Sequence, residues 1–209
     1  MIVPAILTSQ RDEFIKMLNQ SREYNWYVQI DIMDGKFVPS QSIDINILKG
    51  LKYPLGSEAH LMVDDPANWI EVFKSFGAER VIFHFEINKD KEEIIDQISR
   101  SGLSVGLAVN PDTQIEDFSY LVPQIDVILF MSVVPGFYGS RFIPSVLDKI
   151  KKFKTFFPQK RIGIDGGIKI DNVRKVHKIG IDYICVGSAI FEEKSPKDAY
   201  QRFLEVTGE

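Results

Sequence analysis

Short apolar segments and segments of helical periodicity alternate eight times along the 209-residue chain. Gly77, Gly102 and Gly180 each end a helical stretch shortly before the next apolar segment. Eight strand-then-helix units without a linker favour a parallel sheet, and eight such strands close naturally into a barrel. We therefore predict an α/β fold, a single-domain (β/α)8 TIM barrel over residues 1–209, with a doubly wound open sheet as the alternative. The expected strands are Ile2–Leu7, Tyr27–Met33, Gly56–Met62, Arg80–Glu86, Ser104–Asn110, Asp126–Val133, Arg161–Asp165 and Tyr183–Val186.

Charge, hydropathy and cysteine content argue against several classes of partner. The formal net charge of -4 gives no electrostatic reason to expect nucleic acid or an anionic membrane. No run approaches the ~18 apolar residues of a membrane span, and the N-terminal residues lack the features of a signal peptide. The single cysteine, Cys185, is typical of a reducing compartment and lies in an apolar run, where we expect a small buried hydrophobe. The sequence predicts a soluble, cytoplasmic protein.

Polar side chains occupy inward-facing positions of the expected strands. Because alternate residues share a strand face, the apolar residues around Ile30 meet the helices and leave Gln29 and Asp31 facing inwards. The same alternation directs His60 and Asp165 inwards at the strand ends, where barrel enzymes have their active sites. A buried carboxylate needs partners. Four polar groups on three strands therefore predict a site, with a hydrogen-bond network that merely closes the barrel as the alternative.

A second histidine, His84, lies near the end of another expected strand, two residues before Glu86. We expect His84 to support the site through a hydrogen bond to that carboxylate. His177 lies in a helical stretch between Lys175 and Lys178, and we expect it on the solvated surface.

Glycine-rich turns follow the last three expected strands. Glycine lets backbone N–H groups approach an anion closely, and barrels commonly bind phosphate with the loops after strands seven and eight. Each turn alone is weak evidence of a ligand site, but their combined position predicts phosphate binding. The candidate residues are Gly136, Gly139, Gly166, Gly167, Gly187 and Ser188.

Five segments carry a resemblance to a known family. The stretch DIMDGKFVP (Asp31–Pro39) resembles the DVMDGHFVPN signature of ribulose-phosphate 3-epimerases, and MSVVPGF (Met131–Phe137) is similar to their MSVNPGF segment. The segments His60–Val63, Ile164–Ile168 and Val186–Phe191 resemble further motifs of the family in order and spacing. The resemblance extends from about Val3 to Phe191.

This resemblance implies metal-assisted proton transfer at carbon 3 of D-ribulose 5-phosphate, giving D-xylulose 5-phosphate in the pentose phosphate pathway. Asp31 and Asp165 would be the acid and base, and both would bind a divalent cation together with His60. Their strands are three steps apart around the ring, so the carboxylates approach the substrate from nearly opposite sides, which suits epimerisation. The cation would act as a Lewis acid.

Methionines of the motifs are further candidates for the substrate site. Met33, Met62 and Met131 match family methionines that cover the reacting carbons with polarizable, water-excluding thioethers, and ordinary core packing is the alternative.

The sequence departs from the family pattern at the site. Gln29 stands where the family has a second metal-binding histidine, and as a fourth ligand its amide oxygen would bind zinc or iron more weakly than imidazole does. The metal thus stays open among zinc, iron, manganese and magnesium. Other departures are Ala5 for a serine, Val134 for an asparagine, Tyr138 for a glycine, which would restrict the conformations open to the phosphate loop, and Ser140 for a glutamine.

Three functions remain open: an isomerase of the ribulose-phosphate 3-epimerase type, an epimerase or isomerase of another phosphorylated ketose, and a non-catalytic sugar-phosphate-binding barrel. Retention of both aspartates favours an enzyme. Decarboxylases of orotidine or gulonate phosphates have a lysine where this chain has Met33, which counts against them. The resemblance also implies a homo-oligomer, in which Phe156 and Phe157 are candidate contacts if they are not buried against the next strand.

Overall fold

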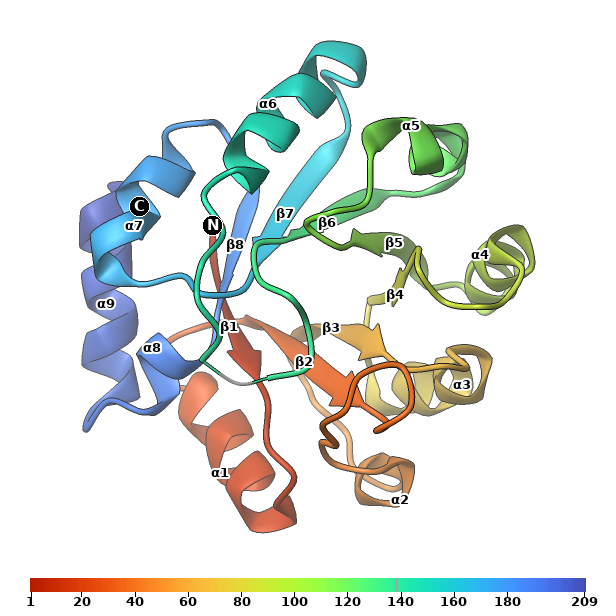
Figure 1. Cartoon of the computed structure of the whole chain (residues 1–209). Helices are drawn as coiled ribbons and strands as arrows, with labels where there is room; N and C mark the ends of the chain where they lie inside the picture. The colour runs from red at the N-terminus through yellow and green to blue at the C-terminus, as the bar shows by residue number, and fades with distance from the viewer. Residues whose placement is uncertain (138) are drawn as a thin grey trace.

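Eight parallel strands form a closed barrel with the helices arranged around its outside (Figure 1). The computed structural model describes residues 1–137 and 139–209, so the expected effect of Tyr138 on the phosphate loop lies outside the described residues. Ile2 of the first strand pairs with Ile184 of the last, which closes the ring and confirms the predicted barrel over the open sheet. The strands are β1 (Ile2–Ile6), β2 (Tyr27–Met33), β3 (Gly56–Met62), β4 (Arg80–His84), β5 (Ser104–Val109), β6 (Val127–Met131), β7 (Arg161–Asp165) and β8 (Tyr183–Val186).

Helices follow the strands in the order expected for repeated strand–helix units. Apolar residues at helical spacing bury one face of each long helix, as Ile70 and Phe73 do in α3. The helices are α1 (Arg11–Ser21), α2 (Ile45–Leu48), α3 (Ala67–Phe76), α4 (Lys91–Arg100), α5 (Ile115–Phe118), the 3-10 helix η1 (Ser119–Gln124), α6 (Val146–Phe156), α7 (Ile170–His177), α8 (Ser188–Phe191) and α9 (Pro196–Thr207). Among the described residues, no helix combines the length and apolar character that a membrane crossing requires.

Four strands have the predicted bounds, and the other four are shorter at one or both ends. The prediction that β4 extends to Glu86 is wrong, because the chain turns after His84. In that turn Glu86 accepts hydrogen bonds from the backbone N–H of Asn110 (2.8 Å) and from the Thr113 hydroxyl. β1, β5 and β6 likewise end before Leu7, Asn110 and Ser132, and β6 begins after Asp126.

The strands have an apolar outer face and a partly polar inner face, as their alternation predicts. Val28, Ile30 and Ile32 belong to the layer between sheet and helices, which contains most of the buried apolar side chains. A separate apolar cluster fills the barrel interior and includes Ala5 and Leu129. The polar groups of the site lie above this inner cluster, where the strands end.

A buried ion pair lies at the opposite, N-terminal end of the barrel. Glu58 is fully buried and accepts hydrogen bonds from the Arg80 guanidinium (2.6 Å) and the Tyr27 hydroxyl (3.2 Å). Glu58 shares the inward face of β3 with His60 and is the register partner of Gln29 on β2, but its side-chain hydrogen bonds are to Tyr27 and Arg80 at the strand starts.

Candidate active site

A pocket opens at the C-terminal ends of the strands. Asp31 and Asp165 contribute to its wall, and so do Ala5 and Ser140, two of the positions that depart from the family pattern. Gln29 and His60 are absent from the wall because both side chains are fully buried below it. The wall also contains every candidate substrate-binding residue, namely Met33, Met62, Met131, Gly136, Gly139, Gly166, Gly167, Gly187 and Ser188.

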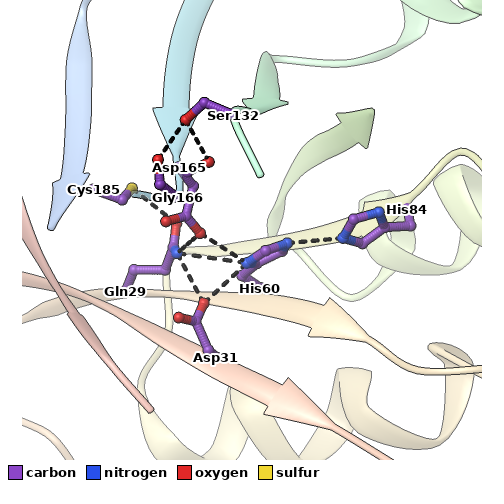
Figure 2. Close-up of polar contacts among 8 residues, drawn as sticks. All are labelled: Gln29, Asp31, His60, His84, Ser132, Asp165, Gly166 and Cys185. Atoms are coloured by element: carbon purple, nitrogen blue, oxygen red, sulfur yellow. Dashed lines mark hydrogen bonds and ion pairs between the residues drawn. The ribbon is translucent and has the colours of Figure 1, made fainter. Parts of the chain in front are cut away.

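Two carboxylates and an imidazole converge below the pocket (Figure 2). Asp31 and His60 are register partners on β2 and β3, and their Oδ1 and Nδ1 atoms lie 2.9 Å apart. Asp165 reaches the same imidazole nitrogen from β7, with its Oδ2 3.3 Å away. One ligand atom from each residue lies within 4.8 Å of the other two. Two buried carboxylates and one histidine are a donor set that a divalent cation can use.

The amide of Gln29 lies between the two carboxylates. Its Nε2 is 2.8 Å from Asp31 Oδ1 and 2.8 Å from Asp165 Oδ2, so each carboxylate accepts one hydrogen bond from it. Its Oε1 points the other way and accepts a hydrogen bond from the Cys185 thiol (3.0 Å). Cys185 is buried as expected, but it contacts a polar site residue, which its apolar sequence neighbours did not indicate.

A chain of hydrogen bonds links His60 to Glu86. His60 Nε2 lies 2.9 Å from His84 Nε2, and His84 Nδ1 lies 3.3 Å from Glu86 Oε2. The predicted contact between His84 and Glu86 is therefore confirmed. Because a carboxylate only accepts, His84 donates from Nδ1 and can accept at Nε2 from His60. This direction leaves His60 Nδ1 to face Asp31 and Asp165.

Burial and charge shift the pKa values of these groups. Burial, followed by the charge of Asp165, raises the pKa of Asp31 to about 6. Burial lowers the pKa of His60, but hydrogen bonds to Asp165 and Asp31 outweigh it and raise the pKa to about 10. Burial lowers the pKa of His84, which keeps that ring neutral. A carboxylate that titrates near neutrality is suited to accept and return a proton.

Ser132 holds the end of β7 and was not among the predicted site residues. Its hydroxyl can donate to the backbone carbonyl of Asp165 (2.9 Å) or of Gly166 (2.6 Å), and its N–H donates to the Asp165 carbonyl (2.7 Å). Ser132 lies inside the MSVVPGF segment, so its position in a site motif was the signal that could have identified it.

Comparison with known proteins assigns this arrangement to a family. Residues 1–191 match the ribulose-phosphate 3 epimerase family. The chain belongs to the ribulose-phosphate 3-epimerase family. Curated relatives with the name ribulose-phosphate 3-epimerase include those of Eremothecium gossypii, 30% identical over 94% of this chain and 88% of the relative, and Chlamydia muridarum, 36% identical over 87% and 83%.

Solved structures show the same fold at much lower identity. The 3-hexulose-6-phosphate synthase of Salmonella typhimurium has a TM-score of 0.71 at 17% identity and covers 99% of this chain and 97% of its own. The structure of KGPDC from Streptococcus mutans has a TM-score of 0.74 at 13% identity and covers 99% and 96%. These likenesses support the TIM barrel.

A divalent metal is implied for members of the ribulose-phosphate 3-epimerase family, and the buried group of Asp31, His60 and Asp165 fits one. Gln29 differs from these three because its nitrogen, which cannot ligate a metal, faces the carboxylates. Its role as a fourth ligand therefore stays a prediction that requires its oxygen to face the site.

Proposed function

We propose that this protein interconverts D-ribulose 5-phosphate and D-xylulose 5-phosphate, with Asp31 and Asp165 as the acid and base at carbon 3. Membership of the ribulose-phosphate 3-epimerase family and the names of the curated relatives support this activity. The observation that carries the assignment is that two carboxylates from strands three steps apart converge on one point at a pocket wall.

The two carboxylates can exchange protons with opposite faces of one carbon. One carboxylate removes the proton, and the other, protonated, returns a proton to the opposite face. Asp31 suits both roles because its pKa is raised to about 6 by burial and by the charge of Asp165. Asp165 is held in place through its main chain by Ser132. The thioethers of Met33 and Met62 line the pocket and keep water from the reacting carbon.

The residues Asp31, His60 and Asp165 would hold the divalent cation, with Gln29 as the fourth ligand. When bound, the cation would stabilise the negative charge that develops on the substrate oxygens. This donor set is richer in oxygen than one with two histidines, which favours manganese or magnesium over zinc or iron.

The phosphate of the substrate would lie against the glycine turns after β6, β7 and β8. Gly136, Gly139, Gly166, Gly167, Gly187 and Ser188 share the pocket wall with the two carboxylates, which supports one site for both ends of a phosphorylated ketose.

A cytoplasmic location, a place in the pentose phosphate pathway and a homo-oligomer are further proposals. The exposed ring of Phe156 supports it as an oligomer contact. Phe157 is half-buried and packs on Phe153, with ring centroids 4.9 Å apart, which favours the alternative of burial for that residue.

Turnover of the proposed substrate tests the assignment. Metal-stripped protein is incubated with D-ribulose 5-phosphate and one of Mg²⁺, Mn²⁺, Fe²⁺ or Zn²⁺, and D-xylulose 5-phosphate is followed by NMR. We expect a metal-dependent product and a loss of roughly 10²–10⁴-fold in Asp31→Asn and Asp165→Asn. Asp12→Asn, whose side chain is 98% exposed, is the control and should retain activity. Folded wild-type protein without product under every metal would overturn the assignment and favour another ketose or a binding role.

A further inference from the structure

The amide of Gln29 is fully satisfied without a cation. The side chain is completely buried, and its two N–H groups have one acceptor each, Asp31 Oδ1 and Asp165 Oδ2, both at 2.8 Å. Its oxygen accepts from the Cys185 thiol at 3.0 Å. The two carboxylates, which would otherwise repel one another, thus share the amide as a neutral donor in addition to the His60 imidazole, and the amide supplies part of the stabilisation that a bound cation would give.

The amide nitrogen also occupies the place of a ligand atom. It lies 2.8 Å from each carboxylate oxygen and 3.5 Å from His60 Nδ1, while the separations between His60 Nδ1 and those two oxygens are 2.9 and 3.3 Å. The amide nitrogen therefore lies within 3.5 Å of all three candidate ligand atoms. An amide nitrogen with both hydrogens directed at carboxylates has no lone pair to offer a metal there.

Rotation of the amide by half a turn exchanges its two ends. Gln29 Oε1 would then face the carboxylates and could bind a hard cation, and Nε2 would face Cys185 Sγ. In that orientation the thiol loses Oε1 as its acceptor, and a single weakly accepting sulfur faces the two N–H groups of the amide. Cys185 therefore favours the orientation in which nitrogen faces the carboxylates.

We propose that Gln29 is an amide switch: with its nitrogen inwards it bridges Asp31 and Asp165 in place of a cation, and with its oxygen inwards it becomes the fourth ligand. Cys185 biases the switch towards the nitrogen-inward orientation, so the cation is bound weakly and exchanges readily. This inference rests on the proposed cation site but is independent of the substrate and of turnover.

The isosteric variant Gln29→Glu tests the bridging role. Replacement of the amide nitrogen by oxygen places three carboxyl groups together without the donor pair. We measure the thermal midpoint of each protein in chelator and at one fixed Mn²⁺ concentration, about 100 times the wild-type Kd. We expect Gln29→Glu to have a lower midpoint than wild type in chelator. Because a third carboxylate binds the cation more tightly than an amide does, the same Mn²⁺ concentration should raise the midpoint of Gln29→Glu by more than the roughly 5–10 °C expected for wild type.

In wild-type protein Mn²⁺ should raise the thermal midpoint by no more than these roughly 5–10 °C, because the amide already satisfies both aspartates. Gln159→Glu, at an exposed turn between α6 and β7, is the matched control and should behave as wild type. Equal midpoints of wild type and Gln29→Glu in chelator would overturn the switch.

Cys185→Ser tests the bias and uses a binding readout. A serine hydroxyl donates and accepts with similar ease, so it would satisfy either end of the amide. In cobalt titrations followed by absorption, we expect Cys185→Ser to bind Co²⁺ about 3- to 10-fold more tightly than wild type, the range that one net hydrogen bond supplies.

The cobalt titration also separates this proposal from the proposed function. Unchanged or weaker Co²⁺ affinity in Cys185→Ser would overturn the switch. Absence of Co²⁺ binding in wild type and in Gln29→Glu would overturn it together with the cation site. Failure to turn over D-ribulose 5-phosphate leaves all of these binding results unaffected.

Discussion

The Nε2 atoms of His60 and His84 lie 2.9 Å apart, so one of these rings must donate a proton to the other (Figure 2). The direction follows from Glu86, which already accepts from the N–H of Asn110 and faces His84 Nδ1. His84 therefore accepts at Nε2, and His60 presents Nδ1 to the two aspartates. A ligand whose second nitrogen is fixed in this way is held in orientation and in tautomer.

Substitutions of His84 should weaken the cation site in a graded way. His84→Phe fills a similar volume but cannot accept the proton of His60 Nε2, and we expect a 10- to 100-fold loss of Mn²⁺ affinity. His84→Gln retains an acceptor oxygen and should lose less. Calorimetric titration of the metal-stripped variants measures both affinities. Equal losses in the two variants would show that His84 contributes volume rather than an acceptor.

The stability of the metal-stripped protein should fall as pH rises from 6.5 to 8. Hydrogen bonds to Asp165 and Asp31 outweigh burial and raise the pKa of His60 to about 10. Between the ordinary value of 6.5 and this raised value, the folded protein keeps a proton that the unfolded chain has lost. The free energy of unfolding should therefore decrease with pH, by about 1–2 kcal/mol over this interval.

Chemical denaturation at the two pH values measures that decrease, and NMR of labelled histidine follows His60 directly. The interval ends near pH 8 because of Lys149, whose pKa is lowered to about 8 by burial. Above that pH the folded protein loses the Lys149 proton while the unfolded chain keeps it, so Lys149 makes the free energy of unfolding rise with pH. A His60 ring that loses its proton near pH 6.5 in the metal-stripped protein would contradict this prediction.

The turn after β7 should not tolerate a side chain at Gly167. Gly167 has a φ of 64°, and a Cβ there would lie 2.6 Å from the backbone nitrogen of Phe142. Gly102 has a φ of 85° with nothing within 4 Å of such a Cβ, so it is a control for the backbone strain alone. We expect Gly102→Ala to cost about 1–2 kcal/mol and Gly167→Ala to cost at least about 1 kcal/mol more.

Kinetics separate a structural from a substrate-binding effect at the same turn. Gly167→Ala should raise KM for D-ribulose 5-phosphate, because the clash displaces a segment of the pocket wall, whereas Gly102→Ala should leave KM unchanged. If Gly167→Ala is less stable but has the wild-type KM, the turn does not contact substrate.

Much of the barrel could be predicted because its signals are local. β2, β3, β7 and β8 have the predicted bounds, since each ends at or just before a stretch of the glycine, aspartate or proline residues that are typical of turns. β4 was extended too far because Phe85 continues the apolar run, while the turn that releases Glu86 depends on Asn110 and Thr113 in another loop. Contacts with distant segments decide such ends.

The residues of the site could be predicted from the sequence, but the contacts between them could not. Alternation along each strand was enough to direct Asp31, His60 and Asp165 inwards. The contact between Gln29 and Cys185 joins β2 to β8, and it depends on the closure of the ring and on which end of the amide faces inwards. Neither ring closure nor the amide orientation can be inferred from the residues of one strand alone.

Solvent exchange at carbon 3 is the most direct test of the proton transfer between Asp31 and Asp165. The protein with Mn²⁺ is incubated with D-ribulose 5-phosphate in D2O, and the label is located by NMR. Because the returning carboxylic acid exchanges its proton with solvent, we expect D-xylulose 5-phosphate to carry deuterium at carbon 3. Asp31→Asn and Asp165→Asn, each supplied with either epimer, should allow exchange in one epimer without net conversion. Product that forms without deuterium at carbon 3, or with deuterium only at carbon 1, would contradict proton transfer by the two aspartates.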